Sequence, residues 1–366
     1  MYEIIVVGAG PAGSTFARFL SEKYSVLVID KKTSDLNGEW KENGFRKPCG
    51  GLLAPKAQTV LSSFGDTVPK DILSDPQIYS VKTIDLKNGA IRHYPRQYVN
   101  TDRHKFDLWL MGKINPSFSV KEGMVTKIEK TENGYKVTYT ANGEQFSEEC
   151  KYLVGADGAS SIVRKFIAPK QKMRSYVSIQ QWFESQTKPF YACVFDRKNT
   201  DCYSWALEKD GMFIFGGAYP HKNSRERFED QKKSLEKYGF KFGEPVKTEA
   251  CLVLRPKNGK NFCFGKDGVF LLGESAGLIS PSGLEGISSA LLSGRYLADA
   301  FNAQIANDGS KYEVNAGKLR KAYVKKVKKI KTRLLIKLLK CIPMYNPFCR
   351  YLVMKSGLTS IKVDEE

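Results

Sequence analysis

The sequence has few of the residues that bind metal ions. Its 366 residues include only three histidines, and its eight cysteines contain no C-x-x-C pair, so no zinc site is indicated. The start of the sequence also lacks a charged segment followed by an apolar segment and a small-residue cleavage site, the pattern of a secretion signal. We therefore expect a cytoplasmic, reducing location, where most cysteines are buried thiols.

Acidic residues are absent from one long segment. Between Lys318 and Lys340 there are eleven Lys or Arg and no Asp or Glu, against a net charge of +19 for the chain. Apolar residues recur there at spacings of three and four, as on one stripe of a helix: Leu319, Tyr323, Val327, Ile330, Leu334 and Leu338. The segment is too charged to span a bilayer. Either the stripe packs on the protein with the basic face in water, or the helix lies on an anionic membrane surface.

Two further features bear on that segment. Pro343 and Pro347 follow it, and we expect them to interrupt the chain there. The basic run lacks the interleaved aromatic residues of a single-strand nucleic-acid platform, so no nucleic-acid partner is expected. A charge of +19 still favours an anionic partner, such as a membrane surface or a phosphorylated substrate.

The remaining composition is ordinary. Hydrophobic residues make up 42% and charged residues 27%, typical of a folded globular protein. A chain of 366 residues can bury a large core, and we expect two lobes.

The first fifteen residues carry the most specific motif. An apolar run over 3–7 leads into Gly8-Ala9-Gly10-Pro11-Ala12-Gly13, and a helix-forming segment follows. In such a junction Gly8 permits the turn, Gly10 lets a diphosphate approach the helix N-terminus, and Gly13 lets helix and strand pack. A second strand over 25–29 ends in Asp30, at the distance where an acid meets ribose hydroxyls. The motif predicts nucleotide binding; its alternative is a glycine turn in an ordinary βαβ unit.

Later segments repeat this arrangement. A buried strand over 152–154 runs into Gly155-Ala156-Asp157-Gly158, and another over 269–272 runs into Gly273-Glu274. Junctions of this kind at neighbouring strand ends converge on one crevice. A further glycine turn at 283–287 opens a helix reaching 303, whose positive end could face the same crevice.

Two more residues are candidates for ligand contacts. Cys49 lies in Pro48-Cys49-Gly50-Gly51, where paired glycines let a flat ligand approach the backbone; the alternative is a structural turn with an inert thiol. Arg103 lies in the first turn of a helix that Asp102 caps, an unfavourable place for a cation. It contacts either a specific anionic or polar group or only water.

The other elements indicate a second lobe built on an antiparallel sheet. Strand-rich segments follow residue 171, with one polar helix around 224–238. Their aromatic residues, including Tyr203 and Trp205, form either a core or the wall of an apolar pocket. Elsewhere we expect a loop at 31–47, a helix at 56–64, a hairpin at 78–94 and a small meander between 120 and 149.

Together these motifs resemble the spaced fingerprints of FAD enzymes of the p-hydroxybenzoate hydroxylase fold. The resemblance rests on Gly8 to Gly13 with Asp30, Arg103 before Phe106-Asp107-x-Trp109-Leu110, and the junctions at 155–158 and 273–274. Within that superfamily, Pro48-Cys49-Gly50-Gly51 and Tyr203-Ser204-Trp205 are similar to motifs of geranylgeranyl reductases, flavoenzymes that saturate isoprenoid double bonds. The chain also resembles the bacterial CbrA proteins, nearly end to end. This likeness is carried by segments 47–55, 180–183, 202–205, 213–220 and 284–288.

The sequence departs from these patterns at two places. Glu274 stands where the superfamily usually has Asp, which changes little. Ala206-Leu207-Glu208 follows Trp205 instead of the aromatic-Pro ending of the reductases, which leaves the substrate open.

The resemblance implies an α/β and α+β fold in three parts. These are a discontinuous Rossmann-like FAD-binding domain (1–75, 100–170 and 260–310), a substrate domain on an antiparallel sheet (76–99 and 171–259) and a basic C-terminal helical region (311–366). Gly8, Gly10 and Gly13 would hold the FAD diphosphate, Asp30 the adenosine ribose, Arg103 the diphosphate or ribityl region, and Glu274 the ribityl-diphosphate side. Other residues of the expected cofactor site are Ala12, Lys31, Cys49, Gly50, Gly51, Asp157, Gly273, Gly283, Gly286 and Ile287.

The resemblance also implies an FAD-dependent reductase of isoprenoid or other apolar substrates. Cys49 would have a redox or proton-donor role, while Tyr203 and Trp205 would line the lipid channel. A monooxygenase of the same fold and a membrane-surface protein with a vestigial flavin domain are the alternatives. No second dinucleotide fingerprint is present, so NAD(P)H, ferredoxin or another protein remains open as electron donor. If the basic helix lies on lipid, the protein is peripheral at the inner face of the membrane.

Overall fold

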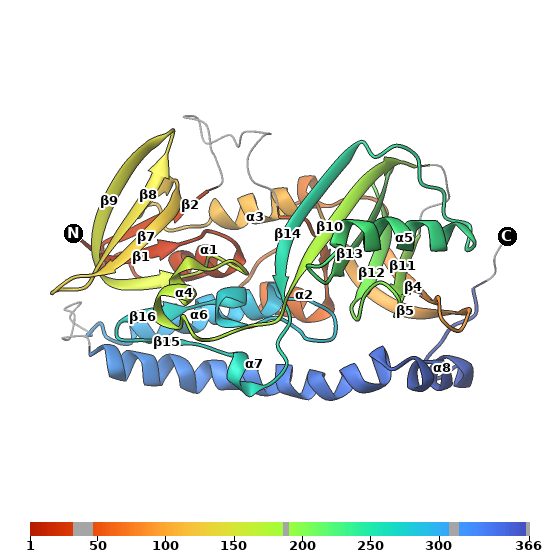
Figure 1. The fold of residues 1–366 in the computed structure, drawn as a ribbon. Coiled ribbons are helices and arrows are strands. Elements are labelled where there is room, and N and C mark those ends of the chain that lie inside the picture. Colours follow the sequence, from red (N-terminus) through yellow and green to blue (C-terminus); the bar gives the residue numbers. More distant parts are fainter. Residues whose placement is uncertain (32–46, 186–189, 307–314, 364–366) are drawn as a thin grey trace.

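The computed structural model describes residues 1–31, 47–185, 190–306 and 315–363. One half contains a first sheet with its helices, the other half contains a second sheet, and two C-terminal helices run beneath both (Figure 1). The loop expected at 31–47 falls almost wholly on 32–46, outside the described residues. The domain boundaries expected from the sequence remain a prediction.

The first sheet is Rossmann-like, as expected. Its strand order is β15-β16-β9-β1-β2-β6, and the five strands from β16 to β6 run parallel. Buried apolar strands such as β1 suit a parallel sheet that is covered on both faces. The strands are β1 (Tyr2–Val7), β2 (Val26–Asp30), β6 (Ser119–Glu122), β7 (Met124–Lys130), β8 (Tyr135–Ala141), β9 (Glu144–Gly155), β15 (Gly265–Lys266) and β16 (Val269–Leu271).

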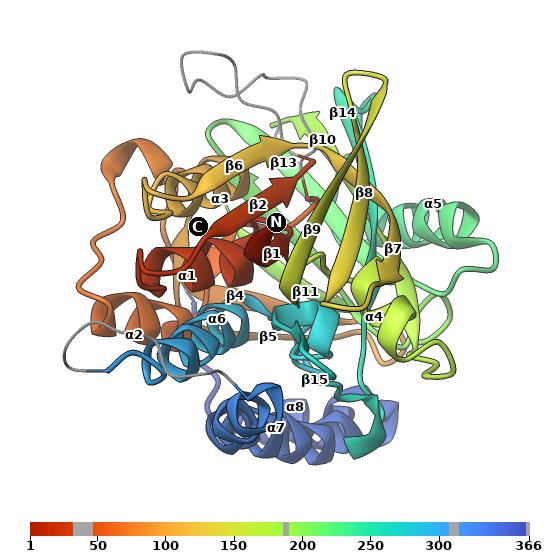
Figure 2. The ribbon, with the colours of Figure 1, turned by 90° about the vertical axis from the view of Figure 1, so that its left-hand side faces the viewer.

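The helices of this half include α1 and α6, which cross at very short range. A Cβ on Gly294 would lie 2.4 Å from the carbonyl oxygen of Ala12, so only glycine allows this approach. Figure 2 shows α6 between α1 and α7. The helices are α1 (Pro11–Phe19), α2 (Pro55–Ser63), α3 (Arg103–Met111), α4 (Ile162–Ile167) and α6 (Ile287–Asn302), with 3₁₀ turns at Lys70–Ile72, Gly259–Asn261 and Gly273–Ala276.

The second sheet has the order β14-β10-β13-β12-β11-β4-β5-β3. Helix α5 (Ser224–Glu236) packs on one face through Phe228 and Leu235. Because side chains alternate along a strand, Tyr98, Tyr191 and Trp205 gather on the other face. The strands are β3 (Leu52–Leu53), β4 (Ile78–Asp85), β5 (Ala90–Asn100), β10 (Ser175–Glu184), β11 (Tyr191–Phe195), β12 (Tyr203–Lys209), β13 (Met212–Tyr219) and β14 (Lys247–Leu254).

Three features of the sheets differ from the expectations. The last strand of the expected meander and the buried strand at 152–154 are one strand, β9. It pairs with β8 at its start and with β1 of the parallel sheet at its end. Residues 119–122 form β6, which pairs with β2 in parallel. The second sheet also contains one parallel pair, β4 with β11, because the segment joining them passes through the other half of the molecule.

The C-terminal helices are α7 (Ala316–Tyr345) and α8 (Pro347–Ser356). The stripe expected on α7 packs on the protein: its first five members are buried and Leu338 is partly exposed. The expected interruption at Pro343 is wrong, because α7 continues through it to Tyr345. Near a helix end the missing N–H removes a single hydrogen bond. Pro347 begins α8, where its N–H would be unpaired in any case.

Candidate active site

A cavity of about 880 Å³ extends from the glycine junctions of the first sheet to the aromatic face of the second. Its volume is within the range of small-molecule sites. Gly13, Gly51 and Gly273, all expected in the cofactor site, are not on its wall. The other expected site residues line it: Gly8, Gly10, Ala12, Asp30, Lys31, Cys49, Gly50, Arg103, Asp157, Tyr203, Trp205, Glu274, Gly283, Gly286 and Ile287.

The first turn has the geometry of a dinucleotide-binding junction. Gly8 has φ +99°, and a Cβ on it would lie 2.6 Å from the carbonyl oxygen of Ala156. A Cβ on Gly13 would lie 1.9 Å from the carbonyl oxygen of Gly8, so Gly13 serves packing. Gly10 caps α1 without a side-chain hydrogen bond, and a Cβ on it would meet no atom within 4 Å. Gly10 therefore leaves the N-terminus of α1 open to the cavity.

Gly51 and Gly273 support the wall from behind. Gly51 has φ +67°, and its Cβ would lie 2.1 Å from the carbonyl oxygen of Thr101. Gly273 has φ +53°, and its Cβ would lie 3.1 Å from the Cβ of Ala12. Both positions need glycine for backbone conformation and close approach.

Two carboxylates, at the ends of the strands on either side of β1, face the cavity. Asp30 accepts a hydrogen bond from the N–H of Ala9, which ties β2 to the glycine turn. Asp157 accepts from the Ser161 hydroxyl at 2.6 Å and from the N–H of Val163 at 3.2 Å. Burial raises the pKa of the Asp157 carboxyl, and these hydrogen bonds oppose the rise. The structure thus brings the first two junctions to one cavity.

Both carboxylate oxygens of Glu274 have protein partners. One lies 2.6 Å from Nζ of Lys47, and the other accepts from the N–H of Leu254 at 2.9 Å. Burial alone would lower the pKa of Lys47, but the Glu274 carboxylate outweighs it and the pKa is raised. Glu274 therefore joins β14 to the segment before Cys49, and its contact with a cofactor stays a prediction.

Arg103 lies between a carboxylate of its own helix and Cys49. Its Nε donates to Asp107 at 2.9 Å, and the Cys49 side chain lies close to its guanidinium. Burial would lower the pKa of Arg103, but Asp107 and Cys49 outweigh it and raise it. Asp102 caps the helix as expected. Of the two interpretations left open for Arg103, the structure therefore shows a specific contact.

Lys209 is a buried amine beside the same turn, and the sequence did not reveal it. Its side chain, 3% exposed, donates to Oδ1 of Asn100 and, at 2.6 Å, to the carbonyl oxygen of Thr101. A Cβ on Gly51 would lie 2.8 Å from Nζ. Burial lowers the pKa of Lys209 to about 8. A single lysine in a strand carries no signal of such burial.

Strand β12 directs Tyr203 and Trp205 into the cavity. The Tyr203 hydroxyl donates to the carbonyl oxygen of Gly283 at 2.9 Å, which connects the second sheet to the glycine turn at 283–287. The indole N–H of Trp205 donates to Gln180 at 3.2 Å. A Cβ on Gly216 would lie 2.7 Å from the indole ring, so this glycine lets the ring lie against β13.

One end of the cavity is lined by residues that the sequence did not assign to the site. The hydroxyl of Tyr98 donates to Glu285 at 3.3 Å, and Nζ of Lys337 lies 3.3 Å from the other oxygen of Glu285. Arg333 and Leu334 of α7 line the same region. Helix α7 therefore contributes to the cavity wall, although its sequence suggested only packing or a membrane surface.

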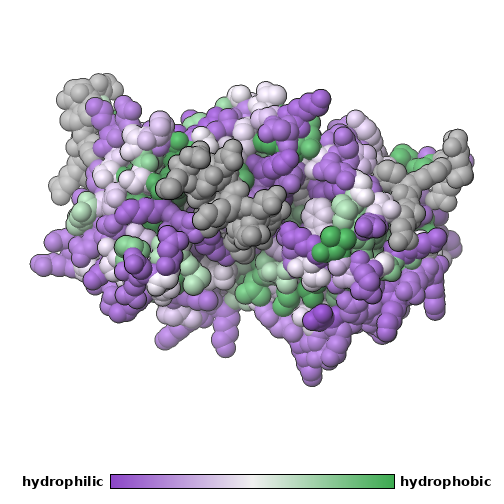
Figure 3. Space-filling model, turned by 90° about the horizontal axis from the view of Figure 1, so that it is seen from above, coloured by the Kyte–Doolittle hydropathy of each residue, from purple (hydrophilic) through white to green (hydrophobic). Residues whose placement is uncertain are grey.

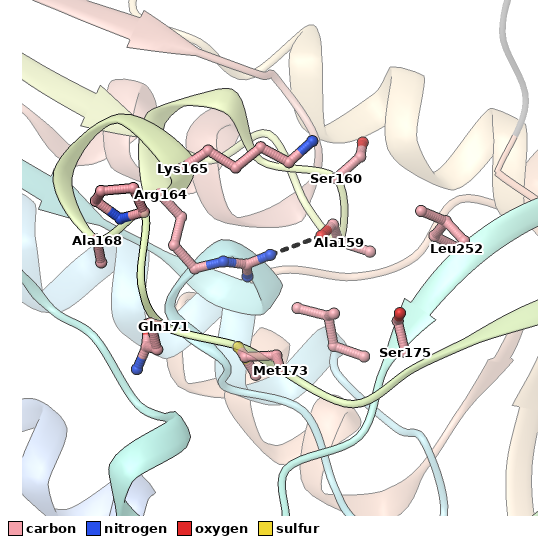
Figure 4. A pocket seen from close by; sticks show the side chains of 11 residues that line it. Ala159, Ser160, Arg164, Lys165, Ala168, Gln171, Met173, Ser175 and Leu252 are labelled. Carbon is pink, nitrogen blue, oxygen red and sulfur yellow. Dashed lines mark hydrogen bonds between the residues drawn. The ribbon is translucent and has the colours of Figure 1, made fainter.

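A smaller cavity of about 280 Å³ lies beside α4 (Figure 4). Arg164 of α4 lines it and donates to the carbonyl oxygen of Ala159 at 2.8 Å. Burial lowers the pKa of Arg164. Ala159, Ser160 and Leu252 line both cavities, so the two cavities share part of their walls.

The first-sheet side of the large cavity fits a dinucleotide. The uncapped N-terminus of α1 suits a diphosphate, Asp30 offers a carboxylate at the end of β2, and Arg103 supplies a cation. Gly286 caps α6 without a side-chain hydrogen bond, so the positive end of that helix faces the cavity as well. The aromatic wall beyond Cys49 suits a second, apolar ligand.

Comparisons with known proteins agree with this geometry. Residues 110–250 match the FAD binding domain, and residues 6–52 match the NAD(P)-binding Rossmann-like domain. Protein CbrA of Escherichia coli K12 and its counterpart in Escherichia coli O157:H7 are each 42% identical over 362 residues, covering 98% of this chain and 98% of each relative. The chain belongs to the CbrA family. The family resemblance expected from the sequence is confirmed.

Solved structures of other proteins share the fold of this CbrA family member. A geranylgeranyl bacteriochlorophyll reductase-like protein from Thermoplasma acidophilum superposes with a TM-score of 0.76 at 18% identity, covering 99% of this chain and 92% of that chain. Klebsiella pneumoniae HpxO, complexed with FAD and uric acid, gives 0.65 at 14% identity, covering 97% and 92%. The flavin-dependent brominase Bmp2 gives 0.64 at 18% identity, covering 97% and 92%. With the domain match, these likenesses support FAD as the cofactor and an FAD-dependent oxidoreductase fold.

Within the part of the chain that the structure describes, no helix is long and apolar enough to cross a membrane.

Proposed function

We propose that this protein is an FAD-dependent reductase of carbon–carbon double bonds in an isoprenoid or polyprenyl lipid. The observation that carries the proposal is the continuity of the cavity, which joins a dinucleotide crevice to an apolar aromatic wall. A reductase of long apolar chains needs both parts side by side, because the chain must lie against the reactive ring while water is excluded.

The residues on the first-sheet side would bind FAD. The N-terminus of α1 behind Gly10 would hold the diphosphate, Asp30 and Lys31 the adenosine ribose region, and Arg103 the diphosphate or ribityl region. Asp157 and Glu274 would shape the ribityl side, Glu274 through its bonds to Lys47 and Leu254. The turn at 283–287 would lie beside the pyrimidine edge of the ring.

The residues on the second-sheet side would position the substrate. FAD, when bound and reduced, supplies a hydride to one carbon of the double bond. Cys49 would hold the proton for the adjacent carbon, at a thiol that lies close to Arg103. Trp205 and Tyr203 would lie along the isoprenoid chain of the substrate. The Tyr203 hydroxyl, which donates a hydrogen bond to the carbonyl oxygen of Gly283, would position the glycine turn at 283–287.

Lipids copurified with the protein test the proposal. They would be extracted and weighed by mass spectrometry before and after anaerobic reduction with dithionite. We expect an isoprenoid whose mass increases by two hydrogens in the wild type. In Cys49→Ala the shift should be lost while FAD stays bound. Cys251→Ala, which removes another thiol on the same wall, is the matched control and should retain it.

Two results would count against the proposal. Full turnover in Cys49→Ala with FAD intact would exclude the role of Cys49. Rapid oxidation of the reduced protein in air, together with a product that has gained one oxygen, would instead identify a monooxygenase. The electron donor is open between NAD(P)H and ferredoxin, and anaerobic mixing with each would identify the one that bleaches the flavin absorbance.

A further inference from the structure

Exposed apolar side chains concentrate at the C-terminal end of the described chain. Of the eighteen large hydrophobic side chains that are exposed among the described residues, ten lie between 336 and 363. Singly exposed apolar residues are normal, whereas a group of them marks an interaction surface. We name as the C-terminal apolar patch the five on the outer faces of α7 and α8: Ile336, Leu339, Ile342, Phe348 and Leu352.

Helix geometry places each part of this patch on one face. On α7 the patch residues are three apart, and on α8 they are four apart, so neighbours point the same way. The buried stripe of α7 ends at Leu334. Beyond that residue, Ile336, Leu339 and Ile342 of the helix are exposed to solvent. In Figure 1 the end of α7 and α8 lie together at the lower edge of the molecule.

The patch is held rigidly. Arg350 of α8 forms a buried pair with Asp85 at 2.9 Å, and Arg92 donates to the carbonyl oxygen of Met354 at 2.9 Å. Both contacts fix α8 against the hairpin β4–β5. The exposed apolar side chains therefore belong to a fixed surface of the folded protein.

The charge around the patch has one sign. From Lys318 to Val363 the sequence has fourteen Lys or Arg and no Asp or Glu. Lys340 and Lys355 flank the patch, and Lys325 and Lys329 are exposed along the first half of α7. A second copy of this chain would bring two such basic surfaces together, which is unfavourable. Apolar side chains within a basic border suit the surface of an anionic bilayer.

The opposite side of the molecule differs. Figure 3 shows the face seen from above as mainly hydrophilic, with apolar residues in small separate areas. Helix α7 lies on the side away from this face (Figure 1). Helix α7 also lines the large cavity through Arg333, Leu334 and Lys337, within one turn of Ile336. The patch and one end of the cavity thus share a helix.

We propose that the C-terminal apolar patch and its flanking lysines dock this protein on an anionic lipid bilayer, beside the cavity end that α7 lines. The apolar side chains enter the boundary between headgroups and acyl chains, while the lysines lie at the anionic headgroups. This goes beyond the proposed reaction, although a bilayer would also be the source of an isoprenoid chain. The apolar end of α7 with α8 is then the anchor, and the basic first half of α7 contributes long-range attraction.

Vesicle flotation of the full-length holoprotein tests this proposal. The probes are vesicles of phosphatidylcholine alone and of phosphatidylcholine with 30% phosphatidylglycerol. We expect binding to the anionic vesicles to exceed binding to the neutral ones at least tenfold. Leu339→Glu/Phe348→Glu should reduce anionic binding at least tenfold. The matched control Tyr79→Glu/Val246→Glu, which alters exposed apolar residues elsewhere, should bind as the wild type does.

A third variant separates charge from apolar contact. Lys325→Gln/Lys329→Gln should weaken binding less than the patch variant and should flatten its dependence on salt. All altered side chains are exposed, so we expect each variant to fold. Flavin absorbance and thermal unfolding would check this. Neither Leu339 nor Phe348 lines the cavity, so turnover of a detergent-solubilised substrate should not change.

Three outcomes would overturn the docking proposal. In the first, the wild-type protein does not bind anionic vesicles. In the second, the patch variant binds them as well as the wild type does. In the third, the wild type forms a dimer without lipid and the patch variant does not. None depends on the reaction, because flotation measures binding alone. Loss of the proposed reductase activity in every assay would leave this result unaffected, so the two proposals fail separately.

Discussion

At the scale of single residues, the glycines of the first turn have separate roles that the motif does not distinguish. Gly13 faces the carbonyl oxygen of Gly8, whereas Gly10 faces open space. A substitution at Gly13 therefore acts on the fold, and one at Gly10 acts on whatever fills the cavity.

The first prediction compares these two glycines. Gly13→Ala should lower the free energy of unfolding of the apoprotein by about 2–4 kcal/mol, because its Cβ collides with backbone. Gly10→Ala should change it by less than about 1 kcal/mol but weaken FAD binding at least tenfold. Urea denaturation and FAD fluorescence titration measure the two effects. Equal loss of FAD affinity without loss of stability in Gly13→Ala would contradict the assignment.

Lys209 provides a prediction about pH. Burial lowers its pKa from the ordinary value of 10.5 to about 8. Between these values the unfolded chain binds more protons at this site than the folded chain does. This site therefore makes the protein more stable as pH rises from 8 toward 10, by less than about 1.4 kcal/mol per pH unit. Urea denaturation of wild type and Lys209→Met at pH 7, 8, 9 and 10 should show this rise in the wild type only. Parallel pH curves for the two proteins would contradict it.

At the scale of elements, α8 depends on one buried ion pair. Asp85 ends β4 and is fully buried, and Arg350 is 5% exposed. Two further contacts to Asp85 come from the turn that follows, through the N–H of Lys87 and the side chain of Asn88. The pair therefore joins α8 to the hairpin β4–β5 of the second sheet.

Removing one partner should be worse than removing both. Arg350→Met leaves the Asp85 carboxylate buried without its cation, and should lower the free energy of unfolding by about 3–5 kcal/mol. Arg350→Met/Asp85→Asn should recover part of this loss. Urea denaturation of the two variants and Asp85→Asn completes the cycle. Additive effects of the single changes would show that the pair is not coupled.

At the scale of the whole molecule, the cavity is built from segments far apart in the sequence. Residues 8, 10–12, 47–50, 156–160 and 283–290 all line it. A ligand that fills the crevice will stabilise every segment that contacts it, by an amount that grows with its concentration relative to the dissociation constant.

Hydrogen exchange measures this directly. Adding FAD to the apoprotein should slow amide exchange in all four segments together, and at 100 times the dissociation constant should stabilise the fold by about 2.7 kcal/mol. Helix α5, none of whose residues lines the cavity, is an internal reference. Protection confined to 8–12 would mean that FAD does not occupy the crevice as a whole.

Local patterns predicted much of this architecture because they act over short distances. The strand, glycine turn and helix at 2–19, the Asp102 cap of α3 and the apolar stripe of α7 all follow from neighbouring residues. Patterns failed where partners are distant. The parallel pairing of β6 and the unbroken β9 depend on tertiary contacts.

The sequence by itself determined a nucleotide-binding fold, because glycine spacing, apolar strands and a following acid are local requirements of the diphosphate junction. It also determined the family, through motifs spread along the chain. Only the tertiary structure decided which glycines face the cavity, that Arg103 lies close to Cys49, and that Lys209 is buried. It likewise decided that α7 both lines the cavity and exposes apolar side chains at its end. Each of these depends on distances between residues far apart in the chain, which spacing along the sequence does not contain.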